Sequence, residues 1–227
     1  MMLAVIAVNV AAFLYELHHG VLLSTLDYGL IPDWLLHGRR EGPIELPGVG
    51  TVVLHQEVPV LLTIFTSMFL HGGWLHLIGN MWFLWVFGDH VEGEMGGLRF
   101  VAFYLLCGIA AAIAQVAITP GATAPMVGAS GAIAGVLGAY LRLHPHARVR
   151  CLWILIVFVT FVDLRAWILL GVWFLSQFFM PIDAGVAWMA HVGGFIAGFL
   201  VVPLFVRAPP AIHPPQQIGD WAHPPAP

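Results

Sequence analysis

Residues 128–144, with the sequence GASGAIAGVLGAYLRLH, form a short apolar stretch that is rich in glycine and alanine. A helix that crosses a bilayer core about 30 Å thick needs roughly 20 residues. This shorter stretch therefore suits a helix that is shielded by its neighbours and begins inside the membrane. Its small residues share one face at helical spacing, where another helix can approach closely: Gly131, Ala134, Gly135 and Gly138. The stretch predicts a buried helix within a membrane-embedded bundle.

The composition of the whole chain supports a membrane protein. Of its 227 residues, 60% are hydrophobic and only 9% are charged, and the mean hydropathy is +0.91. A soluble domain of this length cannot bury so much apolar surface. The chain has no lysine and no long basic run, so the composition excludes nucleic-acid binding as a function.

Six segments are apolar enough to span a membrane and predict an all-α, polytopic fold of six transmembrane helices. They cover residues 1–19, 73–93, 98–118, 128–144, 164–181 and 186–206. We expect residues 1–207 to form one membrane domain, in which the long first connection, residues 20–70, lies partly in the membrane interface. Residues 208–227 hold seven of the 16 prolines and are predicted to be a disordered tail.

The segment 151–162 is apolar but too short to span a membrane alone. We expect it to be an interfacial or re-entrant piece, or to extend the fifth helix. Basic residues near the span ends predict that both termini lie in the cytoplasm. The first loop carries only Arg39 and Arg40, whereas the side assigned to the cytoplasm carries Arg99, Arg142, Arg148, Arg150 and Arg207. A short chain with this pattern suits a prokaryotic inner membrane.

Ser130 stands at the start of the predicted fourth span. Polar groups inside a span are costly and are usually functional. The backbone amides at a helix start have no intrahelical partner and carry the positive end of the helix dipole, so this position suits a nucleophile beside an oxyanion. A helix N-cap and a small residue at a tight helix crossing are alternatives. The GxSG motif is weak alone, because Ala132 replaces the second glycine of a GxSxG elbow.

His191 lies about one turn inside the predicted sixth span, in the sequence AHVGGFIAG of residues 190–198. It shares a helical face with two glycines that form a GxxxG contact surface. If this face packs on the small face of residues 128–144, the imidazole reaches the Ser130 hydroxyl and acts as its base. A structural hydrogen bond or haem ligation are the alternatives. The glycines expected to pack near the site are Gly128, Gly131, Gly135, Gly194 and Gly198.

His76 and Asn80 are four residues apart in the predicted second span, so both side chains project from one face. Both can donate hydrogen bonds and, with the Ser130 backbone amide, stabilise an oxyanion. The alternative is a polar clamp between helices, worth about 0.6 kcal/mol on average in membranes. Asp163 and Arg165 flank a possible turn and could pair. Three further polar residues near span ends remain unassigned: Gln115, Ser176 and Gln177.

Three motifs together resemble those of rhomboid proteases. Residues 71–80, HGGWLHLIGN, resemble the family's HxxxxHxxxN segment, residues 128–131 its GxSG, and residues 190–198 its AHxxGxxxG. They occur in the family's order on three predicted spans, and the resemblance covers residues 1–206. It implies a six-helix core with a water-filled cavity open to the outside.

The resemblance also implies an intramembrane serine endopeptidase that cleaves peptide bonds in or near transmembrane helices of membrane-protein substrates. Ser130 would attack, and His191 would act as base without a third acidic member. His76, Asn80 and the Ser130 backbone amide would hold the oxyanion. The implied partners are these substrates and the lipid bilayer, and no cofactor or metal is implied. The chain lacks the Trp-Arg pair that many rhomboids carry in the first loop, so we expect this loop to dock differently.

Three other functions are alternatives to the protease. A catalytically silent rhomboid-like protein that binds membrane helices would not need the full set of Ser130, His191 and two oxyanion donors. A haem or metal protein is suggested by the 12 histidines, but most lie in loops, span ends or the tail, and no HExxH occurs. A transporter would show repeated halves with broken helices, and no convincing internal repeat is present.

Overall fold

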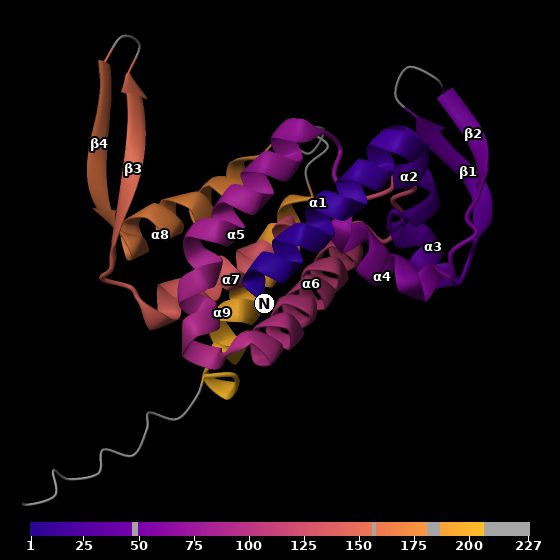
Figure 1. Ribbon diagram of the computed structural model, residues 1–227. Coiled ribbons are helices and arrows are strands. Elements are labelled where there is room, and N and C mark those ends of the chain that lie inside the picture. Colours follow the sequence, from indigo (N-terminus) through magenta and orange to yellow (C-terminus); the bar gives the residue numbers. More distant parts are fainter. Residues whose placement is uncertain (47–49, 156–157, 181–186, 207–227) are drawn as a thin grey trace, which may run out of the picture.

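The computed structural model describes residues 1–46, 50–155, 158–180 and 187–206, and this part of the chain is mostly helical (Figure 1). Helices occur at all six segments predicted to be apolar spans, and each bound differs from the prediction by no more than two residues. They are α1 (Met2–His19), α5 (Trp74–Met95), α6 (Gly97–Ile118), α7 (Ser130–Leu143), α8 (Ala166–Ser176) with the 3-10 turn η3 (Gln177–Phe179), and α9 (Trp188–Val201) with η4 (Val202–Leu204).

Fewer helices than the six predicted spans qualify as membrane spans by length and composition alone. In the described residues, α1 and α6 are long and apolar enough to cross a membrane. A third span arises if Val60–Phe69 and Trp74–Met95, bent by 80° at their junction, form one unit. The helical regions of α7, α8 and α9 are apolar but shorter. The chain is therefore a helical membrane protein with two or three candidate spans, and the count of six stays a prediction.

Helix α7 is the buried helix that its small residues predict. All residues from Gly131 to Tyr140 are buried, and α7 contacts α5, α6, α8 and α9. Its apolar side chains belong to the main hydrophobic cluster, together with residues of α5 and α6 such as Leu84 and Phe103. The start of α7 is thus held from several sides inside the bundle.

The first connection, residues 20–70, is more structured than predicted. It contains α2 (Val21–Tyr28), α3 (Pro32–His37), the antiparallel hairpin β1 (Glu41–Leu46) and β2 (Gly50–His55), η1 (Val60–Leu62), α4 (Thr63–Thr66) and η2 (Ser67–Phe69). Pro32 stands in the first turn of α3, where its missing N–H costs nothing. Gly38 ends α3 in the left-handed conformation, with φ 63°. Pro32 and Gly38 therefore mark the two ends of α3.

The all-α prediction is wrong for two hairpins, which lie at opposite ends of the bundle in Figure 1. Residues 151–155 and 158–162 of the segment 151–162 belong to the antiparallel pair β3 (Arg148–Leu155) and β4 (Phe158–Arg165), rather than to a re-entrant piece or a longer fifth helix. Its Val, Ile, Thr, Phe and Trp residues favour extended structure, and an apolar run of this length does not distinguish helix from strand by periodicity.

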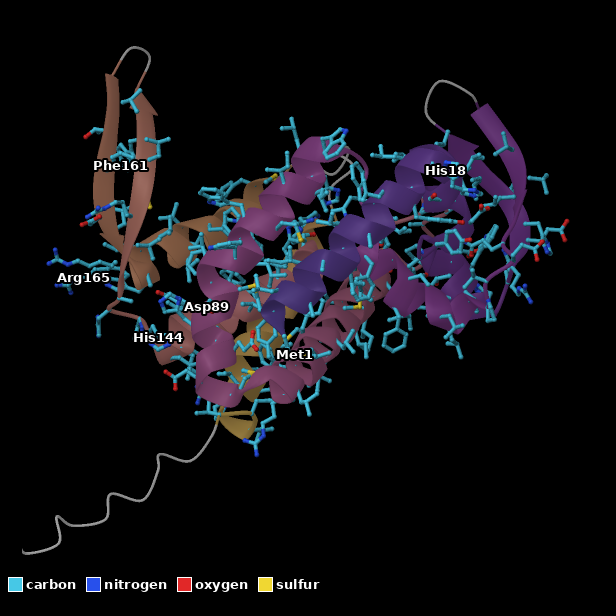
Figure 2. The ribbon with its side chains drawn as sticks, viewed as in Figure 1. Met1, His18, Asp89, His144, Phe161 and Arg165 are labelled. Atoms are coloured by element: carbon cyan, nitrogen blue, oxygen red, sulfur yellow. The ribbon has the colours of Figure 1, made fainter. Side chains whose placement is uncertain are left out.

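The register of β3 and β4 also corrects the predicted pairing of Asp163 with Arg165. Asp163 lies opposite Arg150, whose Nε donates to Asp163 Oδ1 at 3.0 Å, while Arg165 lies opposite Arg148. Figure 2 shows Arg165 and Phe161 on this hairpin, to one side of the helices. Asp163 therefore pairs across the hairpin with Arg150 on the neighbouring strand.

Candidate active site

The crossing of α7 and α9 is close because glycines meet the backbone of the opposite helix. A Cβ atom built on Gly194 would lie 2.0 Å from the carbonyl oxygen of Gly131, and one on Gly198 would lie 1.9 Å from that of Gly135. Real Cβ atoms essentially never approach closer than 3.0 Å. Only glycine is compatible with this separation of the two helices.

The crossing brings together Ser130, the first residue of α7, and His191, in the first turn of α9. His191 Nε2 lies 2.8 Å from Ser130 Oγ, which is hydrogen-bonding distance. The ring of Trp173 from α8 lies 6.0 Å from the imidazole, centroid to centroid. A serine hydroxyl in contact with an imidazole is the arrangement in which histidine can remove the serine proton.

The other ring nitrogen of His191 contacts Gln177, which the sequence left unassigned. His191 Nδ1 lies 2.8 Å from Gln177 Oε1. Gln177 is buried, with 2% of the residue exposed. Its Nε2 donates to the Trp173 carbonyl oxygen at 3.0 Å and to Ser176 Oγ at 3.2 Å. A polar residue inside an apolar span was the available signal, but its partner depends on how η3 turns toward α9.

His76 and Asn80 on α5 face the same region. The backbone N–H of Gly72 donates to His76 Nδ1 at 3.3 Å, so a neutral His76 ring carries its proton on Nε2. Asn80 Nδ2 is buried, and no atom of the described residues accepts a hydrogen bond from it. His76 Nε2 and Asn80 Nδ2 are therefore both N–H donors that can bind an acceptor in this region.

Gly128 separates His76 from Ser130. Its φ is 134°, which favours glycine. A Cβ atom at this position would lie 3.0 Å from His76 Nε2 and 3.5 Å from Ser130 Oγ. The missing side chain therefore leaves a space that both groups border.

These side chains line a cavity of about 420 Å³. His76 and Asn80 reach it from α5, Ser130 from α7, Trp173 from α8 and His191 from α9. The volume exceeds that of a single water, about 30 Å³, many times over. A peptide segment and a hydrolytic water can therefore both be accommodated next to the Ser-His pair.

The third unassigned residue, Gln115 on α6, holds the start of α9. Its Oε1 accepts a hydrogen bond from the backbone N–H of Ala190 at 3.2 Å. Because Ala190 precedes His191, this contact fixes the backbone that carries the imidazole. Gln115 does not line the cavity, so its role is structural.

In the described residues, the histidines outside the cavity belong to no group of three or more metal-ligating side chains. Figure 2 shows His18 and His144 at opposite ends of the molecule. Across the described ranges, no three His, Cys, Asp or Glu side chains come together in a way that could hold a metal ion.

Comparison with known proteins identifies the family. The sequence profile of the Rhomboid domain matches residues 59–208, which include the Ser-His pair and both candidate oxyanion donors. The chain belongs to the rhomboid family. RHOMBOID-like protein 5 of Arabidopsis thaliana is 34% identical over 143 residues, covering 61% of this chain and 42% of that protein.

Two other rhomboid relatives come from yeast and a bacterium. Rhomboid protein 1, mitochondrial, of Saccharomyces cerevisiae is 31% identical over 152 residues, covering 61% of this chain and 40% of the relative. Rhomboid protease GluP of Bacillus subtilis is 44% identical over 78 residues, covering 34% of this chain and 15% of the relative. The chain thus spans less than half the length of these curated relatives.

Proposed function

We propose that this rhomboid is an intramembrane serine endopeptidase that cleaves peptide bonds in or near the transmembrane helices of membrane proteins. The 2.8 Å contact between Ser130 Oγ and His191 Nε2, at the wall of a cavity of about 420 Å³, carries the proposal. Family membership supports it, and one bacterial relative is itself named a rhomboid protease.

In the proposed reaction, Ser130 Oγ forms a bond to the carbonyl carbon of the scissile peptide while its proton moves to His191 Nε2. The negative charge that develops on the carbonyl oxygen is stabilised by three N–H donors: His76 Nε2, Asn80 Nδ2 and the Ser130 backbone amide. The unpartnered Asn80 Nδ2 supports this assignment, because a buried donor without an acceptor costs free energy that a bound oxyanion would recover.

The intermediate then collapses. The C–N bond breaks, the leaving amine takes the proton from His191, and an acyl ester on Ser130 remains. A water molecule attacks this ester as His191 accepts its proton, and the proton returns to Ser130 when the acid product leaves. The step requires a water next to His191, and the cavity has room for one.

The alternative function is a catalytically silent rhomboid that binds membrane helices. Replacing Ser130 with Ala separates the two. The protease proposal predicts that Ser130→Ala abolishes cleavage of a reporter transmembrane substrate in proteoliposomes, while expression and membrane insertion stay at wild-type levels. Thr160→Ala is the matched hydroxyl control and should cleave within twofold of the wild type, because Thr160 is exposed on β4 and does not line the cavity. Equal cleavage by Ser130→Ala and the wild type would refute the nucleophile assignment.

The proposed partners are membrane-protein substrates and the bilayer. We propose that residues 1–207 act as one membrane domain. The predicted tail at 208–227 lies outside the described residues, as does Arg207. The relatives reported above come from a plant, yeast and a bacterium, so a prokaryotic inner membrane with cytoplasmic termini stays a prediction. Reporter enzymes fused to this protein at residues 1 and 207 would test on which side of the membrane each end lies.

A further inference from the structure

Gln177 contacts the catalytic imidazole from the side opposite Ser130. Its Oε1 lies 2.8 Å from His191 Nδ1, and Ser130 Oγ lies 2.8 Å from His191 Nε2. The two contacts place the ring between an amide oxygen and a hydroxyl. The family resemblance supplies a serine and a histidine but no third member, so this contact is additional to the proposed dyad.

The orientation of the Gln177 amide is fixed by its other end. Its nitrogen donates to the carbonyl oxygen of Trp173 at 3.0 Å, and a carbonyl can only accept. The amide oxygen must therefore face His191. Because an amide oxygen cannot donate, the proton of the neutral imidazole lies on Nδ1 and is donated to Gln177. His191 Nε2 then has a free lone pair and accepts the hydroxyl hydrogen of Ser130.

We infer that Gln177 is a positioning residue that holds His191 in the Nδ1-protonated tautomer required of a general base. This inference rests on the proposed function. In that tautomer the only basic nitrogen faces the nucleophile. When His191 takes the serine proton, the ring becomes a cation, and the hydrogen bond from Nδ1 to Gln177 becomes charge-assisted and stronger. Gln177 thus favours the state with the transferred proton over the starting state.

Burial makes the contact consequential. Gln177 is 2% exposed, so water does not replace it readily. The described cavity-lining residues supply no carboxylate next to the ring, and the other titratable side chain there is His76. Without Gln177, the imidazole is free to adopt the Nε2-protonated tautomer or to rotate, and either change removes the acceptor from Ser130 Oγ.

Two substitutions separate positioning from packing. Gln177→Leu keeps most of the side-chain bulk and removes the acceptor. Gln177→Glu keeps an oxygen that accepts from His191 Nδ1 whether the carboxyl is ionised or neutral. We expect Gln177→Leu to lower kcat about 10- to 100-fold with KM unchanged. We expect the kcat of Gln177→Glu to be at least about tenfold higher than that of Gln177→Leu. Gly171→Ala in α8 (Ala166–Ser176) is the control, because a Cβ built on Gly171 meets nothing beyond its own helix backbone within 4 Å, and it should stay within twofold of the wild type.

The readouts are the cleavage of a reporter substrate and the rate at which a fluorophosphonate probe phosphonylates Ser130, with loss of fluoride. The second reaction needs no substrate docking. Both rates should fall together in Gln177→Leu and recover together in Gln177→Glu. Wild-type rates in Gln177→Leu, or equal losses in the Leu and Glu variants, would overturn the positioning role while the protease proposal stands. A wild-type protein that neither cleaves nor reacts with the probe would instead refute the proposed function.

Discussion

Replacing Gly194 with Ala should strongly lower the proposed protease activity without changing a reactive group. The new Cβ would lie 2.0 Å from the carbonyl oxygen of Gly131 and needs at least 3.0 Å, so α7 and α9 must separate by about 1.0 Å (3.0 − 2.0). If this shift reaches the site one turn away, the distance from Ser130 Oγ to His191 Nε2 grows from 2.8 Å to about 3.8 Å. At that distance the hydrogen bond is lost.

A misplacement of about 1 Å in a catalytic group costs on the order of 10²-fold in rate. We therefore expect the kcat of Gly194→Ala to fall about 100-fold. Overpacking should also lower the free energy of unfolding by about 1–3 kcal/mol. The assay is cleavage of a reporter substrate by purified protein in detergent, with thermal denaturation measured in parallel.

Gly171→Ala is the matched control, because no atom lies within 4 Å of a Cβ built on Gly171 in α8. This variant should keep full activity and the same or slightly higher stability, since alanine favours a helix over glycine by up to about 1 kcal/mol. Wild-type kcat in a folded Gly194→Ala variant would refute the argument that the close crossing aligns the Ser-His pair.

Two further variants test the oxyanion donors and the second hairpin. Asn80→Ala should lower kcat by about 10² to 10³, because one donor is lost while His76 and the Ser130 amide remain; unchanged steady-state kinetics would contradict the assignment. Asp163→Asn should leave turnover and thermal stability unchanged, although Arg150 holds the pKa of Asp163 below its ordinary value. Such a carboxylate adds stability only above its unfolded-state pKa and loses it as pH falls, and this fully exposed pair is screened by water. A measurable drop in melting temperature at neutral pH would show a larger role for the hairpin.

The helices could be predicted from the sequence because long apolar runs in this chain are bounded by polar or glycine residues. The small face of α7 and the GxxxG face of α9 also predicted their contact, since each pattern is informative only when paired with the other. His76 and Asn80 could be placed together because four-residue spacing on a helix fixes a common face. These inferences use local periodicity.

The parts that could not be predicted depend on contacts between distant segments. The run 151–162 has no turn residue to mark the hairpin between β3 and β4, and its β-branched and aromatic residues alone do not distinguish a strand from an apolar helix. The first connection was predicted only as a long, partly interfacial segment, and the positions of Pro32 and Gly38 at the two ends of α3 were not predicted. Gln177 lies 14 residues before His191 on another element, and the packing of η3 against α9 brings the amide to the ring.

The proposed function requires that His191 activates the hydroxyl of Ser130. Labelling with a fluorophosphonate, followed by mass spectrometry of the adduct, tests it most directly. We expect one phosphonylated residue, Ser130, in the wild type, and loss of the adduct in both Ser130→Ala and His191→Ala. Labelling at a different residue, or undiminished labelling of Ser130 in His191→Ala, would contradict it.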